Sequence, residues 1–127
     1  MIVIVDDEAY VRTFVRCHLE HAGCEVVEAA NGPEALSHIA ALQRDVELLI
    51  CDINMPCMDG IELAGSARSA NPSLPILLVS GRFNDKAERF MSQNPSVYRL
   101  DKPFNPRQLR AKIVGILGIS SPAAGES

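Results

Sequence analysis

A chain of 127 residues, 47% hydrophobic and 22% charged, has the size and composition of one globular domain. Its formal charge of −4 argues against direct binding of nucleic acid, because phosphate backbones attract basic surfaces. No apolar run approaches the roughly 18 residues of a membrane span. The N-terminus lacks the basic lead of a signal peptide, so we expect a cytoplasmic domain without membrane insertion.

Five short apolar runs, separated by helical patterns, predict the strands of the fold. In chain order they cover residues 2–5, 24–29, 48–51, 76–79 and 97–100. The first, third and fourth runs are continuous, which is typical of parallel strands that are covered on both faces. The second is a weaker strand, and Arg99 within the fifth indicates a position at the edge of the sheet.

Apolar residues between these runs recur at the spacing of three and four that is typical of amphipathic helices. The predicted helical stripes cover residues 11–22, 35–40, 61–67 and 109–117, and a short, polar fourth helix is predicted at about 84–91. The first stripe consists of Val11, Phe14, Val15, Leu19 and Ala22. Gly23 follows it as a stop signal. Asn105 and Pro106 predict the cap and the first turn of the last helix.

Strands and helices alternate five times, which favours an α/β fold with a five-stranded parallel sheet between two layers of helices. Right-handed crossovers leave few ways to wind such a three-layer (βα)5 sandwich, and we predict the flavodoxin-like strand order 2-1-3-4-5. Residues 1–118 are expected to form this single domain. The small, polar segment 119–127 is expected to be a disordered tail or the stub of a linker.

Three carboxylates follow two strands that this order makes neighbours. Asp6 and Asp7 end the first strand and Asp52 ends the third, at the edge where ligands bind in open α/β sheets. Each alone has an ordinary explanation, as a helix cap or a turn residue. Together they repel one another, and Mg²⁺ relieves that repulsion while keeping waters that a phosphate replaces. A carboxylate can also act as a nucleophile, as in aspartyl-phosphate enzymes.

Two hydrogen-bond donors are predicted at the same edge of the sheet. Ser80 ends the fourth strand and Lys102 follows the fifth. Singly, the serine is typical of a strand end and the lysine of a protein surface. Jointly with the carboxylates, a hydroxyl and an ammonium are the groups that phosphoryl transfer needs, because this reaction depends on positioning and charge stabilisation.

Four segments at the predicted strand ends resemble the receiver domains of response regulators, the family that includes the chemotaxis regulator. They are IVIVDDE at 2–8, CDINMPCMDG at 51–60, VSG at 79–81 and DKPF at 101–104. The resemblance extends over residues 1 to about 118. It implies a flavodoxin-like fold and a phosphorelay switch that receives a phosphoryl group from a histidine kinase or a phosphotransfer protein.

The resemblance implies a role for each matching residue around the acidic edge. Asp52 is the residue that is phosphorylated. Asp7 and Asp52 ligate Mg²⁺ directly, Asp6 acts through a bound water, and Asn54 contributes its backbone carbonyl. Gly60 belongs to the turn that shapes the loop after Asp52, so its role is backbone shape and not chemistry.

The resemblance also implies how the switch works. Lys102 pairs with the phosphoryl group, Ser80 moves to hydrogen-bond it, and the peptide before Pro103 is cis. Phosphorylation then changes the surface around the fourth helix, the fifth strand and the fifth helix. The aromatic residue that the family often has three positions before the lysine is replaced here by Arg99. Tyr98 is expected to face the opposite side of the sheet.

A degenerate receiver, which binds a partner without phosphorylation, is the alternative function, and the complete set of site residues argues against it. A phosphatase with an aspartate nucleophile is disfavoured, because such enzymes carry a second Asp where Asn54 stands. We therefore predict a switch that catalyses its own phosphorylation and slow dephosphorylation, and not a metabolic enzyme. We expect a monomer or a weak homodimer. The sequence does not predict the cognate kinase, the downstream target or whether a larger regulator contains the domain.

Overall fold

The described part of the chain forms a sheet of five parallel strands in the order β2-β1-β3-β4-β5. The computed structural model describes residues 1–55 and 58–118. The strands are β1 (Ile2–Val5), β2 (Val26–Ala29), β3 (Leu48–Asp52), β4 (Ile76–Ser80) and β5 (Val97–Asp101). The predicted strand order is confirmed. The predicted tail at 119–127 lies outside the described residues.

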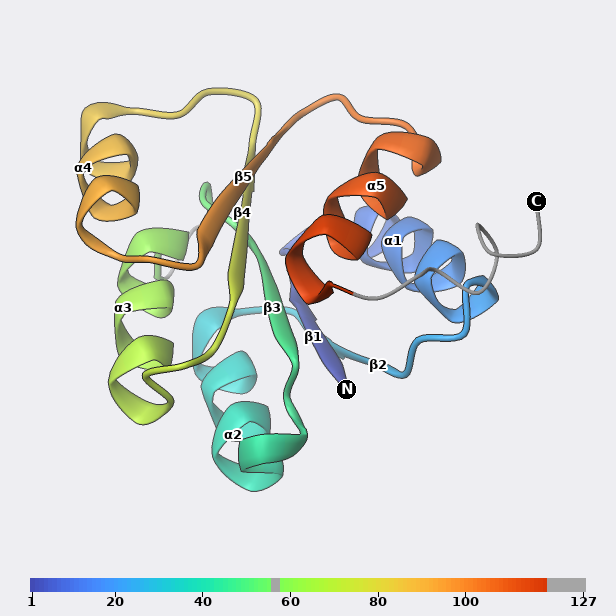
Figure 1. Cartoon of the computed structure of the whole chain (residues 1–127), viewed down its shortest axis with the longest axis horizontal. Coiled ribbons are helices and arrows are strands. Elements are labelled where there is room, and N and C mark those ends of the chain that lie inside the picture. Colours follow the sequence, from blue (N-terminus) through green and yellow to red (C-terminus); the bar gives the residue numbers. More distant parts are fainter. Residues whose placement is uncertain (56–57, 119–127) are drawn as a thin grey trace.

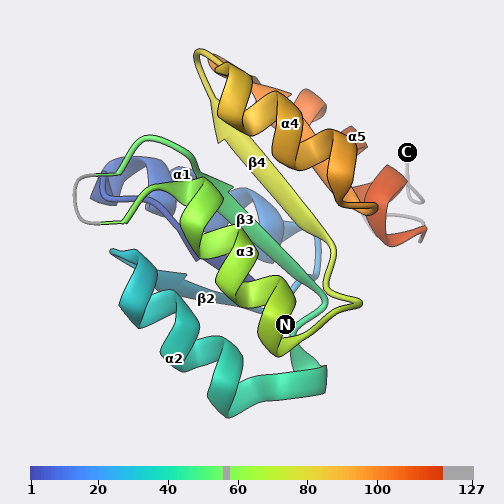
Figure 2. The ribbon, with the colours of Figure 1, turned by 90° about the vertical axis from the view of Figure 1, so that its left-hand side faces the viewer.

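Within residues 1–55 and 58–118, five α-helices cover the two faces of the sheet. They are α1 (Ala9–His21), α2 (Gly32–Leu42), α3 (Gly60–Ala70), α4 (Asp85–Gln93) and α5 (Pro106–Leu117), and a short 3-10 turn (Gln43–Asp45) follows α2. Helices α1 and α5 lie on one face, and α2, α3 and α4 lie on the other (Figure 1, Figure 2). The predicted three-layer sandwich is therefore confirmed. No helix in the described ranges has the length and apolar character to cross a membrane.

The side chains of β1 alternate between two apolar cores. Val3 and Val5 belong to the core beneath α2 and α3, whereas Ile2 and Ile4 belong to the core beneath α1 and α5. All four are almost completely buried, and burying each such side chain contributes about 1.5–3 kcal/mol. Burial on both faces explains why the central strands are continuous apolar runs.

The edge strand β5 has a different pattern, because one of its faces is partly open. Tyr98 packs against the core beneath α1 and α5. Arg99 is exposed, and its guanidinium lies over the ring of Phe83, on the loop before α4. The predicted opposite orientation of Tyr98 and Arg99 is therefore confirmed.

Side-chain oxygens cap the N-termini of four of the described helices. The caps are Asn31 for α2, Asp59 for α3, Asn84 for α4 and Asn105 for α5. At α5 the Gln108 amide donates to the Asn105 side chain and the Asn105 amide donates to the Gln108 side chain, each at 2.8 Å. This reciprocal capping box confirms the predicted start of the last helix.

Strand β2 begins and helix α4 ends two residues later than predicted, and local hydrogen bonds explain both differences. Strand β2 begins later than predicted, because the Cys24 amide donates to the Leu19 carbonyl at 3.0 Å and continues the turn after α1. Helix α4 ends later than predicted, because the side-chain amide of Asn94 donates to the Phe90 carbonyl at 2.9 Å and closes its last turn.

Candidate functional site

The carboxyl ends of β1 and β3 bring three carboxylates together. Val5 pairs with Cys51 in the sheet, so Asp6 and Asp7 after β1 lie beside Asp52 at the end of β3. One carboxylate oxygen from each aspartate lies within 4.8 Å of the others. Asp6 and Asp52 are each only 4% exposed, whereas Asp7 is exposed. A group of carboxylate oxygens at this spacing can hold a divalent cation.

Burial controls the electrostatics of this acidic cluster. Burial raises the pKa of Asp6, although the Glu8 amide and Lys102 oppose the shift. Burial also raises the pKa of Asp52, and the neighbouring charge of Asp6 adds to this increase, while Lys102 again opposes it. Both carboxylates are therefore easier to protonate in the folded chain than in water. A bound cation would favour their ionised forms.

These pKa shifts predict how stability depends on pH. The pKa values of Asp6 and Asp52 are higher in the folded than in the unfolded chain, so the free energy of unfolding falls as the pH rises through them. In EDTA at pH 7, we expect Asp52→Asn to raise the free energy of unfolding by about 0.5–2 kcal/mol. The gain should shrink on acidification towards the unfolded pKa.

Urea denaturation between pH 3 and pH 8 measures this effect. The control is Asp45→Asn, which alters a carboxylate that is exposed and lies in the short turn after α2. The control should leave the pH dependence of unfolding unchanged. An Asp52→Asn chain no more stable than the original at pH 7 would contradict the prediction.

Lys102 extends from the end of β5 towards the acidic cluster. Its backbone amide donates to the Ser80 carbonyl at 2.9 Å, which holds the residue at the carboxyl edge of the sheet. Its Nζ lies 3.5 Å from Asp6 Oδ2 and 3.6 Å from Asp52 Oδ2. The peptide between Lys102 and Pro103 is cis, as the resemblance implied. The structure therefore places this ammonium between the two buried carboxylates.

The Ser80 hydroxyl, fully buried at the end of β4, uses its complete hydrogen-bonding capacity. It donates to the Arg82 carbonyl at 2.7 Å and accepts from the Arg82 amide at 3.0 Å. It also accepts from the side-chain amide of Asn54 at 3.2 Å. The backbone amide of Asn54 in turn donates to Asp52 Oδ1 at 3.2 Å. Asn54 thus links Asp52 to Ser80, a contact that the sequence did not predict because the side chains of Asn54 and Ser80 are 26 positions apart.

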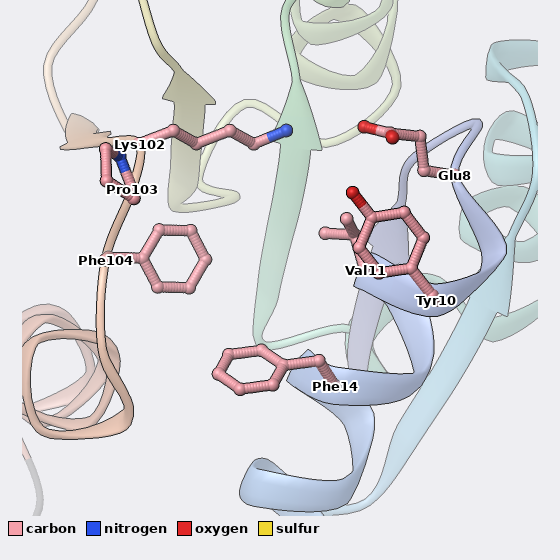
Figure 3. A pocket seen from close by; sticks show the side chains of 7 residues that line it. All are labelled: Glu8, Tyr10, Val11, Phe14, Lys102, Pro103 and Phe104. Carbon is pink, nitrogen blue, oxygen red and sulfur yellow. The ribbon is translucent and has the colours of Figure 1, made fainter.

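An apolar hollow of about 490 Å³ opens beside Lys102, between α1 and the loop after β5 (Figure 3). Its lining residues are Glu8, Tyr10, Val11, Phe14, Lys102, Pro103 and Phe104. Tyr10 is 72% exposed and Phe14 is 38% exposed. Phe14 thus lies in α1, as its spacing predicted, but it is not part of the buried core. Its ring instead faces Phe104, with ring centroids 6.4 Å apart. Two aromatic residues four positions apart were the sequence signal for this surface.

A second hollow, of about 400 Å³, borders the acidic cluster and includes Asp7 and Asn54 in its lining. Lys86 and Asp59 also line it, and Lys86 Nζ lies 2.9 Å from Asp59 Oδ2. This ion pair joins α4 to the cap of α3. Sequence reasoning missed it, because the two residues are 27 positions apart and match no motif.

Known proteins share this fold and are similar in sequence. Residues 2–114 match the response regulator receiver domain family. The alkaline phosphatase synthesis transcriptional regulatory protein PhoP of Bacillus subtilis is 31% identical, over 99% of this chain and 52% of PhoP. The sensor kinase CckA of Brucella abortus is 33% identical, over 91% of this chain and 12% of the kinase. The solved structure of the chemotaxis protein CheY4 of Vibrio cholerae has a TM-score of 0.83 and 31% identity, over 91% of this chain and 97% of that chain.

The chain spans about half the length of PhoP and a small part of the sensor kinase. The shared region is nearly the whole of this chain and nearly the whole of CheY4. Receiver domains interact with histidine kinases or phosphotransfer proteins. The match over residues 2–114 and the common sheet order show that the chain belongs to the response regulator receiver domains, the signalling switches of two-component phosphorelays.

Proposed function

We propose that this receiver accepts a phosphoryl group on Asp52 from the phosphohistidine of a histidine kinase or a phosphotransfer protein. The observation that carries the proposal is the position of the Asp52 carboxylate, which is buried, lies within 4.8 Å of two other carboxylates and is 3.6 Å from the Lys102 ammonium. A nucleophilic carboxylate with charge-stabilising groups around it is what an aspartyl-phosphate reaction requires.

The acidic cluster fits Mg²⁺ as the cofactor of this reaction. Its ligand atoms are carboxylate oxygens, which this hard cation prefers, and exposure of Asp7 leaves room for the waters that Mg²⁺ retains. We assign Asp7 and Asp52 as direct ligands, Asp6 as a ligand through water and the Asn54 carbonyl as a further ligand. When bound, the ion would neutralise the charge that builds up on the phosphoryl oxygens.

The residues of the chain have separate tasks in the transfer. An Asp52 carboxylate oxygen attacks phosphorus, the new O–P bond forms as the P–N bond to histidine breaks, and the electron pair of the broken bond stays on the imidazole nitrogen. Lys102 Nζ, already close to the Asp52 oxygen, pairs with the phosphoryl oxygens. Ser80 hydrogen-bonds the same group. Because Asp52 is 4% exposed, the phosphoryl group has to reach it through the open edge of the site, and the hollow at Tyr10 and Phe14 lies beside Lys102 at that edge.

Intact mass after incubation with acetyl phosphate tests the proposal. We expect the original chain to gain one phosphoryl-sized increment in the presence of Mg²⁺ and none in EDTA. Asp52→Asn should gain none under either condition, and Asp45→Asn should behave like the original chain. An increment that persists in Asp52→Asn would exclude Asp52 as the acceptor.

The alternative is a degenerate receiver that binds a partner without phosphorylation. Failure of the original chain to gain mass, together with failure to bind Mg²⁺, would favour it. We propose residues 1–118 as the receiver domain, in a monomer or weak homodimer that works in the cytoplasm. The activities that further domains add in regulators such as PhoP belong to those longer proteins, of which this chain spans about half.

A further inference from the structure

Arg99 of β5 joins three parts of the structure through one side chain. Its Nη1 donates to Glu88 Oε1 of α4 at 2.8 Å, and its Nη2 donates to Asp101 Oδ1 of the same strand at 3.0 Å. Its guanidinium carbon lies 4.0 Å from the centroid of the Phe83 ring, on the loop between β4 and α4. The plane of the guanidinium allows stacking and two directed hydrogen bonds at the same time.

Phe83 directly follows Arg82, whose backbone amide and carbonyl are both hydrogen-bonded to the Ser80 hydroxyl. The Ser80 hydroxyl has one proton, which it donates to the Arg82 carbonyl at 2.7 Å. Donating that proton to a phosphoryl oxygen on Asp52 requires the hydroxyl to leave the Arg82 carbonyl. The backbone of Arg82 then loses a partner, and Phe83 is the first side chain after it that packs against the core.

We propose that Arg99 is a coupling residue that transmits the hydrogen-bonding state of Ser80 to α4, through the Phe83 ring and the Glu88 carboxylate. This inference rests on the proposed phosphorylation of Asp52. It names the residues that connect the phosphorylated site to α4. The path is continuous in space: Ser80 holds Arg82, Phe83 follows Arg82, Arg99 covers Phe83, and Arg99 binds Glu88. It depends on a guanidinium and not on an aromatic side chain at this position of β5.

The strength of these contacts suits a switch. Arg99 and Glu88 are both exposed, so water and salt weaken their ion pair, and the stacking of an exposed guanidinium on the half-buried Phe83 ring is also modest. Contacts of this strength restrain α4 without fixing it. A change at Ser80 can therefore shift the population of α4 positions.

Hydrogen–deuterium exchange of the chain without any phosphoryl donor tests the restraint by itself. We expect Arg99→Gln and Glu88→Gln each to raise amide exchange within 85–93 by about threefold, because each removes the link to α4. Asp101→Asn is the matched control, since it removes the Arg99 contact that stays within β5. Exchange in Arg99→Gln equal to that of the original chain would overturn the proposed restraint.

The same exchange measurement, with acetyl phosphate and Mg²⁺ present, tests the coupling. We expect phosphorylation to change exchange within 85–93 in the original chain and in Asp101→Asn. Arg99→Gln should be phosphorylated to the same extent by mass, yet lose this response. Arg99→Lys should lose it too, because lysine keeps the charge but lacks the planar group. A phosphorylated Arg99→Gln chain with an unchanged response would overturn the coupling, whereas no phosphorylation of the original chain would overturn the proposed function itself.

Discussion

Gly60→Ala is expected to lower the free energy of unfolding by about 1–3 kcal/mol and to slow phosphorylation of Asp52. Gly60 is the first residue of α3, and its amide donates to the Ile53 carbonyl at 2.9 Å. A Cβ at Gly60 would lie 2.5 Å from the Asp52 carbonyl oxygen and 2.7 Å from Ile53 Cα. Both atoms belong to backbone, so the clash cannot be relieved by turning a side chain. The alanine would push the helix away from the residue that carries the nucleophile.

Gly65→Ala, in the same helix, is the matched control for this prediction. The nearest atom to a Cβ there is Phe90 Cε1 at 4.0 Å, which is an ordinary contact distance. Because alanine has a higher helix propensity than glycine, we expect Gly65→Ala to stabilise the chain by up to about 1 kcal/mol. Urea denaturation and the mass assay with acetyl phosphate measure the two effects. Equal stability and phosphorylation of the Gly60 and Gly65 variants would contradict the proposed close approach.

Lys102→Ala is expected to slow phosphorylation of Asp52 by about 100-fold, the typical effect of removing one charge-stabilising group from a transition state. The same change should strengthen Mg²⁺ binding. Lys102 Nζ lies 3.5 Å from Asp6 Oδ2 and 3.6 Å from Asp52 Oδ2, so this ammonium competes with a cation for the same negative charge. The opposite direction of the two effects distinguishes a role in the reaction from a role in folding.

Calorimetric titration with Mg²⁺ and the time course of the mass increment measure the two effects of Lys102→Ala. Lys112→Ala, which removes an ammonium from α5, is the control and should change neither quantity. If Lys102→Ala weakened Mg²⁺ binding and slowed phosphorylation together, the lysine would be needed for the shape of the site. That result would contradict the proposed role of Lys102 in phosphoryl transfer.

Patterns within single elements allowed much of the fold to be predicted. Strands that are buried on both faces are continuous apolar runs. The central strands and their parallel pairing could therefore be predicted from the sequence. Capping is a local contact, so Asn105 followed by Pro106 predicted the start of α5, where the structure places the cap. The convergence of Asp6, Asp7 and Asp52 followed from strand order, because the carboxyl ends of neighbouring parallel strands meet at one edge.

Only the tertiary structure decided which side chains meet across distant segments. Asn54 and Ser80 are 26 positions apart. Arg99 of β5 contacts both Phe83, in the loop before α4, and Glu88, in α4. Periodicity tells which face of a helix is apolar, but it does not tell how far a neighbouring helix covers that face. Phe14 shows the difference, since it lies within the apolar spacing of α1 yet borders an open hollow. Local spacing thus determined the elements and the acidic cluster, whereas packing between the elements decided the contacts around Ser80 and Arg99.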